Sequence, residues 1–164
     1  MAASIIDGKA IAESIRAELK EKVQMLRSKG IVPGLGAILV GDDPASQTYV
    51  RNKEKACAQL EIYSDVRRVP KETTQEQVLA MVEEFNQRPD IHGILVQLPL
   101  PDHIDEQAVI HAIRPDKDVD GFHPVNVGNL LIGATAFIPC TPHGIIELIQ
   151  RTGVEIKGKR AVVV

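Results

Sequence analysis

A tyrosine and a lysine four residues apart, Tyr49 and Lys53, are the first residues in this sequence whose types and spacing could do chemistry. They follow a strand-like apolar run, 35–40, that ends at a Gly-Asp-Asp-Pro turn, and a helical pattern begins after the turn. On a helix, residues i and i+4 lie on the same face, so the phenol and the amine would be stacked. Because ligands of open α/β sheets bind at the carboxyl ends of strands, the pair is a candidate for proton transfer. The alternative is a solvated, charged helix face.

Two other polar side chains follow predicted strands. Gln97 comes at the end of the apolar run 91–96, and the two prolines that follow it prevent the strand from continuing. A side-chain amide in this position needs a hydrogen-bond partner, so Gln97 is either a structural residue or a ligand contact. Asp120 precedes Gly121 after the next helical segment, on the side of the sheet where ligands bind.

The aspartates of the run 116–121 match only the first half of an EF-hand calcium loop. The twelfth position, which needs a bidentate Glu, is Val127, and Pro124 interrupts the path to it. We therefore interpret these aspartates as turn-capping residues. The five His show no HxxxH or HExxH spacing, and Cys57 and Cys140 are too far apart for a CxxC site, so the sequence predicts no metal site.

Composition predicts a core built from aliphatic side chains. Of the 164 residues, 44% are hydrophobic, but the chain has only two Tyr, three Phe and no Trp. A net charge of −3, with lysines interleaved among glutamates, gives no reason to expect a nucleic-acid partner. We expect no membrane partner, because no apolar run is long enough to cross a bilayer and the N-terminus is no signal peptide. A cytoplasmic location, with its reducing conditions, fits the two cysteines.

Helical and strand-like patterns alternate along the chain. They predict a mostly parallel sheet flanked by helices in a three-layer αβα arrangement. Helices are expected over 9–29, from 44 to 60, after the capping sequence 73–76, over 106–113, and from Pro142 with Thr141 as N-cap; strands are expected over 35–40, 62–69, 91–96 and 161–164, and 126–137 is expected to be irregular. Cys140 is predicted to be a small buried residue, because no His/Asp pattern supports a nucleophile. The strand 161–164 simply stops, which predicts that the chain is a fragment.

The segments YVRNK, GILVQLPLP, DKDVDGFHP and PCTPHGIIELI, in this order, resemble the bifunctional methylenetetrahydrofolate dehydrogenase/cyclohydrolase family from about Ile5 to Val164. The resemblance implies that residues 1–140 form a folate-binding catalytic domain. Residues 141–164 would be a connecting helix and the first strand of an NADP-binding Rossmann domain. NADP is the implied cofactor, but its binding residues are expected after Val164, so this chain is not expected to bind it.

The same resemblance implies roles for individual residues. Lys53 corresponds to the catalytic lysine, Gln97 to the glutamine that hydrogen-bonds and tunes it, and Asp120 to the aspartate that anchors the pterin. These three residues are the catalytic candidates, and they also contact substrate. Tyr49 would pack on the folate ring.

Four other residues are implied to lie in the same cleft. Val96 and Leu98 would flank the glutamine in the substrate wall. Ser46 and Cys140 correspond to cleft-lining residues.

The activity implied by the resemblance has two steps. A hydride passes from the methylene carbon of 5,10-methylenetetrahydrofolate to NADP, and water then adds to the methenyl cation and opens the ring. Both steps need a group that handles protons near neutral pH, which a lysine does when burial or neighbouring donors lower its pKa. The implied partners are tetrahydrofolate derivatives and, at full length, a second copy in a homodimer. The implied pathways lead to purines, methionine and histidine.

Two alternatives stay open at this point. Instead of this enzyme, the chain could be a non-catalytic folate-binding fragment, which activity assays would separate from the enzyme, or an unrelated enzyme whose lysine forms a Schiff base with a carbonyl substrate. Borohydride trapping on Lys53 would support the second alternative.

Overall fold

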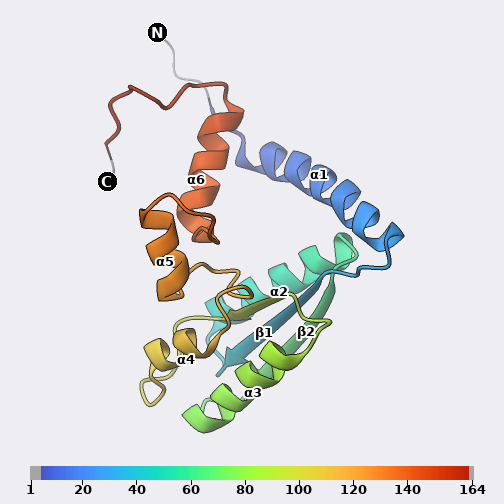
Figure 1. Ribbon diagram of the computed structural model, residues 1–164, viewed down its shortest axis with the longest axis vertical. Helices are drawn as coiled ribbons and strands as arrows, with labels where there is room; N and C mark the ends of the chain where they lie inside the picture. The colour runs from blue at the N-terminus through green and yellow to red at the C-terminus, as the bar shows by residue number, and fades with distance from the viewer. Residues whose placement is uncertain (1–4, 163–164) are drawn as a thin grey trace.

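The computed structural model describes residues 5–162 and contains a three-stranded parallel sheet in the order β2-β1-β3 (Figure 1). β1 (Gly34–Val40) is the central strand, β2 (Tyr63–Val69) pairs with its whole length, and β3 (Gly93–Val96) pairs with Leu35–Ile38. The predicted parallel α/β architecture is confirmed, with strand boundaries shifted by one or two residues.

Helices cover both faces of this sheet (Figure 1). α2 (Pro44–Gln59) packs on β1 and β2, whereas α3 (Gln75–Gln87) packs on β1 and β3 and is itself covered by α4 (Glu106–Ala112). β1 is buried almost throughout, as a strand between two layers of helices must be. Its side chains alternate between the layers, and those of Ile38 and Val40 join the core cluster on the α3 side.

Gly36 explains how closely α3 approaches the sheet. A Cβ atom at this position would lie 2.7 Å from the ring of Phe85, which is fully buried on α3. The glycine therefore makes room for the largest side chain of the core.

α1 (Gly8–Ser28) and α6 (Cys140–Arg151) lie away from the sheet and pack against each other (Figure 1). Val23 is the buried residue of α1, and α6 has no buried residue among those that the structure describes. None of the helices within residues 5–162 combines the length and apolar character needed to cross a membrane.

The prediction that 126–137 is irregular was wrong, because α5 spans Pro124–Leu131. Pro124 occupies the first turn of this helix, where its missing N–H costs nothing, and the Nδ1 atom of His123 accepts the N–H of Val125 as a cap. The proline that breaks the calcium-loop pattern therefore lies in the first turn of a helix.

Two other boundaries differ from the prediction. α6 begins at Cys140 after Pro139, with no side-chain cap, so Thr141 is not its N-cap. Proline is tolerated throughout a first turn, so Pro142 does not fix the register of the helix start. In the predicted strand 161–164, Ala161 and Val162 lie in no strand, since no described strand pairs with them, and residues 163–164 lie outside the described residues.

The segment after α4 attaches to the free edge of β3. The N–H of Ile94 donates to the carbonyl of Lys117 at 2.7 Å, and Ile94 forms a parallel bridge with Asp118. Lys117 is only 9% exposed, and its Nζ atom donates to three backbone carbonyls at the end of α3, those of Phe85, Asn86 and Arg88, at 2.8–3.0 Å. Lys117 thus caps α3 while its burial lowers its pKa.

We expect Lys117→Met to lower the free energy of unfolding by about 2–4 kcal/mol, because it removes the side-chain donor from the carbonyls of Phe85 and Asn86. Urea denaturation measures this change. The control is Lys55→Met, at an exposed position on α2, which should change stability by less than about 0.5 kcal/mol. Equal effects of the two substitutions would show that the Lys117 contacts do not stabilise the fold.

Candidate functional site

One cavity of about 470 Å³ contains all six predicted site residues. It lies where β3 ends, between α2, the turn that follows Asp118, and the start of α6. Its lining consists of the predicted Tyr49, Lys53, Val96, Gln97, Leu98 and Asp120, together with Phe122, Pro139, Cys140, Thr141 and Pro142.

α2 presents the tyrosine and the lysine on the same face. The helix begins with Pro44 after Asp43, whose carboxylate accepts the N–H of Ser46 at 2.7 Å. Tyr49 is 59% exposed, and Lys53 is partly buried one turn later. The Nζ atom of Lys53 donates to Oε1 of Gln97 at 3.2 Å, which fixes the amine at the end of β3.

Gln97 is held by three hydrogen bonds. Its backbone N–H donates to Ile38 of β1 at 2.9 Å, and its side-chain Nε2 donates to the carbonyl of Leu98 at 2.7 Å. Since the amide nitrogen is used in this way, Oε1 is the atom that faces Lys53. Gln97 is therefore a hydrogen-bonded structural residue that also lines the cavity, and the peptide bond between Leu98 and Pro99 is cis.

A tight turn places Asp120 in the cavity. Gly121 adopts a φ of 70°, and a Cβ atom there would lie 2.6 Å from the carbonyl oxygen of Phe137, so only glycine fits. Asp118, 1% exposed, holds the turn because its Oδ2 accepts the N–H of His123 at 2.8 Å and the Nδ2 of Asn126 at 2.9 Å. Asp116 pairs with Arg114.

Charges in the cavity influence each other. Burial raises the pKa of Asp120, the positive charge of Lys53 lowers it, and the nearby Asp118 raises it, with a net upward shift. Cys140 is exposed at the cavity rim, so the prediction of a buried residue was wrong, because α6 begins there and stands away from the core. Partial desolvation and Asp120 raise the pKa of its thiol, which disfavours a nucleophilic thiolate.

Ser46 does not line this cavity. Its side chain is buried at the start of α2, so the implied position in the cleft differs from the one observed. Among residues 5–162, no group of three or more His, Cys, Asp or Glu side chains is placed to hold a metal ion.

The lining also includes residues that the sequence did not indicate. Phe122 was the one with a detectable signal, because it is an aromatic residue directly after the Asp-Gly pair. Pro139 and Thr141 enter the cavity only because α6 packs beside α1, a contact between segments far apart in the sequence.

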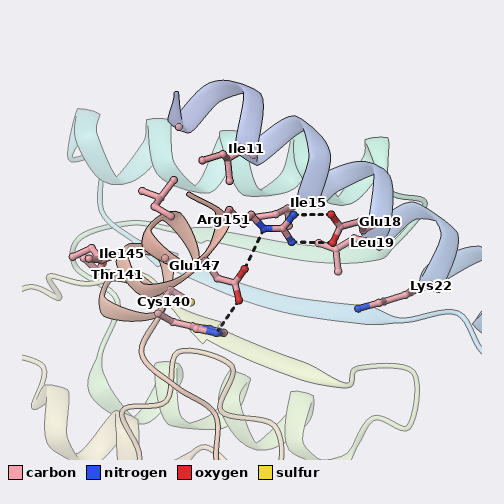
Figure 2. Close-up of a pocket in the computed structure, with 15 residues that line it drawn as sticks. Ile11, Ile15, Glu18, Leu19, Lys22, Cys140, Thr141, Ile145, Glu147 and Arg151 are labelled. Atoms are coloured by element: carbon pink, nitrogen blue, oxygen red, sulfur yellow. Dashed lines mark hydrogen bonds and ion pairs between the residues drawn. The ribbon is translucent and has the colours of Figure 1, made fainter. Parts of the chain in front are cut away.

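A larger cavity, of about 780 Å³, lies between α1 and α6 (Figure 2). Its walls are largely aliphatic, with Ile11 and Ile15 on α1 and Ile145 on α6. Arg151 donates to both carboxylate oxygens of Glu18 at 2.7 and 2.9 Å, which lowers the pKa of Glu18 to about 2. We place the candidate site in the smaller cavity, because the hydrogen-bonded lysine, the half-buried carboxylate and the exposed tyrosine are together there.

The raised pKa of Asp120 predicts a pH-dependent cost to stability. A folded carboxyl group whose pKa exceeds the unfolded value favours folding only while it is protonated, so the cost develops as pH rises from the unfolded pKa through the folded pKa. Urea denaturation at pH 4 and pH 7 should therefore show that Asp120→Asn gains stability relative to the wild type as pH rises. Asp116→Asn is the matched control with the opposite sign, since Arg114 lowers the pKa of Asp116. A difference for Asp120→Asn that shrinks toward pH 7 would contradict the assignment.

Comparisons with known proteins identify the family of this chain. The sequence matches the family model described as tetrahydrofolate dehydrogenase/cyclohydrolase, catalytic domain, over residues 6–120. It is 58% identical over its whole length to the bifunctional protein FolD of Moorella thermoacetica and 54% identical to that of Brevibacillus brevis, and it covers 59% and 58% of these relatives. The chain thus spans less than two thirds of their length.

Solved structures show the same fold. The Campylobacter jejuni bifunctional enzyme FolD superposes with a TM-score of 0.94 at 49% identity, over 96% of this chain and 56% of that one. The Trypanosoma brucei methylenetetrahydrofolate dehydrogenase-cyclohydrolase, solved with NADP and an inhibitor, gives 0.91 at 44% identity, over 97% and 55%. With the family match over residues 6–120, these likenesses show that the chain belongs to the tetrahydrofolate dehydrogenase/cyclohydrolase family.

Proposed function

We propose that this chain supplies the folate-binding and proton-transfer part of an enzyme that oxidises 5,10-methylenetetrahydrofolate and hydrolyses the product to 10-formyltetrahydrofolate. The observation that supports it most is the bond between Lys53 and Gln97 in a cavity that also contains Asp120. The names of the family and of the relatives point to the same pair of reactions.

The hydrolytic step makes the clearest demand on the site. Water attacks the methenyl carbon of the 5,10-methenyl cation, the bond from that carbon to N5 breaks, and one proton is released with 10-formyltetrahydrofolate. Lys53 is the group proposed to take up and pass on protons at its Nζ atom. Gln97 keeps that atom in place, and Val96 and Leu98 flank the glutamine in the wall of the cavity.

Recognition of the pterin is proposed for Asp120 and Tyr49 in the same cavity. The carboxylate of Asp120 would accept charge-assisted hydrogen bonds from the amino-pyrimidine edge. Tyr49, with more than half of its surface exposed, offers an aromatic face for stacking. Thus Asp120 sets the orientation, Tyr49 contributes apolar contact, and Lys53 lies where the one-carbon unit reacts.

NADP is the proposed hydride acceptor of the oxidation, and its site is proposed to lie outside residues 5–162. Rossmann sites bind the dinucleotide pyrophosphate at a Gly-rich turn between a strand and a helix. The sequence contains no G-x-G-x-x-G run, and residues 153–162 include neither strand nor helix. The described residues therefore do not fit the dinucleotide, and we assign them to the folate side only.

The cellular setting is part of the same proposal. One-carbon units in these oxidation states serve purine, methionine and histidine biosynthesis, and a cytoplasmic enzyme that forms homodimers at full length would supply them. The absence of nucleic-acid and membrane partners is likewise proposed, on the basis of the mild negative charge.

We expect Lys53→Met and Lys53→Arg each to slow hydrolysis of 5,10-methenyltetrahydrofolate by about 10²–10⁴-fold, because arginine keeps the charge but does not release a proton. The rate is measured without NADP by the loss of methenyl absorbance. We would assay this chain and also a fusion of it to the carboxy-terminal part of the Moorella thermoacetica relative. The fusion reveals hydrolysis that requires the longer protein.

The control for this experiment is Lys55→Met, an exposed position on the same helix, which should keep the wild-type rate. A full rate in Lys53→Met, or no hydrolysis by either wild-type form, would contradict the proposal. A full rate in Lys53→Arg alone would show that Lys53 acts only through its positive charge and does not transfer protons.

Calorimetry on the chain should detect 5-formyltetrahydrofolate but not NADP. We expect Asp120→Asn to weaken folate binding by about 10- to 100-fold, because a hydrogen bond to a charged group contributes about 1.5–3 kcal/mol. Asp116→Asn, whose carboxylate is paired with Arg114 outside the cavity, should bind as the wild type does. Measurable NADP binding would overturn the assignment of these residues to the folate side.

A further inference from the structure

We propose that Phe122 is a second aromatic contact for the flat ring of the substrate, in addition to Tyr49. This inference rests on the proposed function and deepens it, because it names a binding residue of the same cavity. The chemical class concerned is a planar bicyclic heteroaromatic ring, bound at one edge by Asp120 and on its surface by aromatic side chains.

The turn at Gly121 brings Asp120 and Phe122 into the same cavity. This glycine has a positive φ, and its close approach to the Phe137 backbone leaves no room for a side chain. The carboxylate of Asp118 accepts the N–H of His123, the residue after Phe122, so the turn is held at both ends. The backbone at Phe122 is therefore held on both sides, by Gly121 before it and by the bond to His123 after it.

The exposure of Phe122 is otherwise unexplained. Its side chain is 43% exposed, although the transfer of a phenylalanine side chain out of water lowers the free energy. Other apolar residues of this region, such as Leu131 and Ile132, are more exposed, but they do not line the Lys53 cavity. Phe122 differs from them because it joins the charged and polar groups of that cavity.

Aromatic side chains are scarce in this chain, which makes their positions informative. The sequence has two Tyr, three Phe and no Trp, and one Tyr and one Phe line this cavity. They come from different walls, Tyr49 from α2 and Phe122 from the turn that follows Asp118. A flat ring anchored by Asp120 would meet both, and stacked aromatic rings attract each other beyond simple burial.

The absence of tryptophan from the sequence permits a direct test. In Phe122→Trp, the single indole reports on its own surroundings, and titration with 5-formyltetrahydrofolate should change its fluorescence with saturation at the calorimetric Kd. The matched control is Phe137→Trp, because Phe137 is 39% exposed but lines a different cavity, with Asn126 and Asn129. Its fluorescence should change little.

Truncation provides an independent measurement. We expect Phe122→Ala to raise the Kd for 5-formyltetrahydrofolate by about 3- to 10-fold, with Phe122→Leu between it and the wild type, while circular dichroism confirms that each variant is folded. Unchanged binding in Phe122→Ala, or equal fluorescence changes in the two tryptophan variants, would overturn this inference and leave the proposed function intact. If the wild type itself does not bind the folate, the proposed function fails and this inference fails with it.

Discussion

The docking of residues 117–120 onto the edge of β3 is the contact on which the site depends. The N–H of Ile94 donates to the backbone of this segment. The two buried charged residues of the segment, Lys117 and Asp118, form hydrogen bonds with different parts of the fold. Lys117 caps the end of α3, whereas Asp118 holds the turn that follows. Neither charge is left without partners, so their burial is tolerated. Asp120 reaches the cavity because this short segment is fixed at the carboxyl side of the sheet.

The site is assembled from elements that do not adjoin in sequence. α2 brings Lys53, the end of β3 brings Gln97, the docked segment brings Asp120, and α6 closes the cavity with its first turn. The last of these elements has few contacts with the rest of the fold apart from α1. Cys140 and Thr141 line both the smaller cavity and the larger one between α1 and α6, so the placement of α6 affects the two together.

Local sequence patterns predicted most of the sheet and its covering helices. The apolar run of β1 and the spacing of Tyr49 and Lys53 were sufficient, because burial on both faces and the helical repeat leave clear traces in sequence. The boundaries around α5 and α6 were not predictable in the same way, since Pro124 is compatible with either a break or a helix start, and Pro142 fits several positions of a first turn.

The site residues also divide into those that local sequence patterns indicated and those that they did not. The spacing of Tyr49 and Lys53 made them candidates, with a solvated helix face as the alternative. No local rule connects Lys53 with Gln97, 44 residues away. The family resemblance supplied that connection. Phe122 was missed because an exposed aromatic residue is ambiguous until the cavity beside it is seen, and Cys140 was misjudged because its burial depends on how α6 packs.

The most direct test of this account is a crystal structure of the chain with 5-formyltetrahydrofolate. The account predicts the pterin edge at the carboxylate of Asp120 and the one-carbon group within hydrogen-bonding distance of the Nζ atom of Lys53. Folate bound in the larger cavity between α1 and α6, or bound with its one-carbon group away from Lys53, would contradict it.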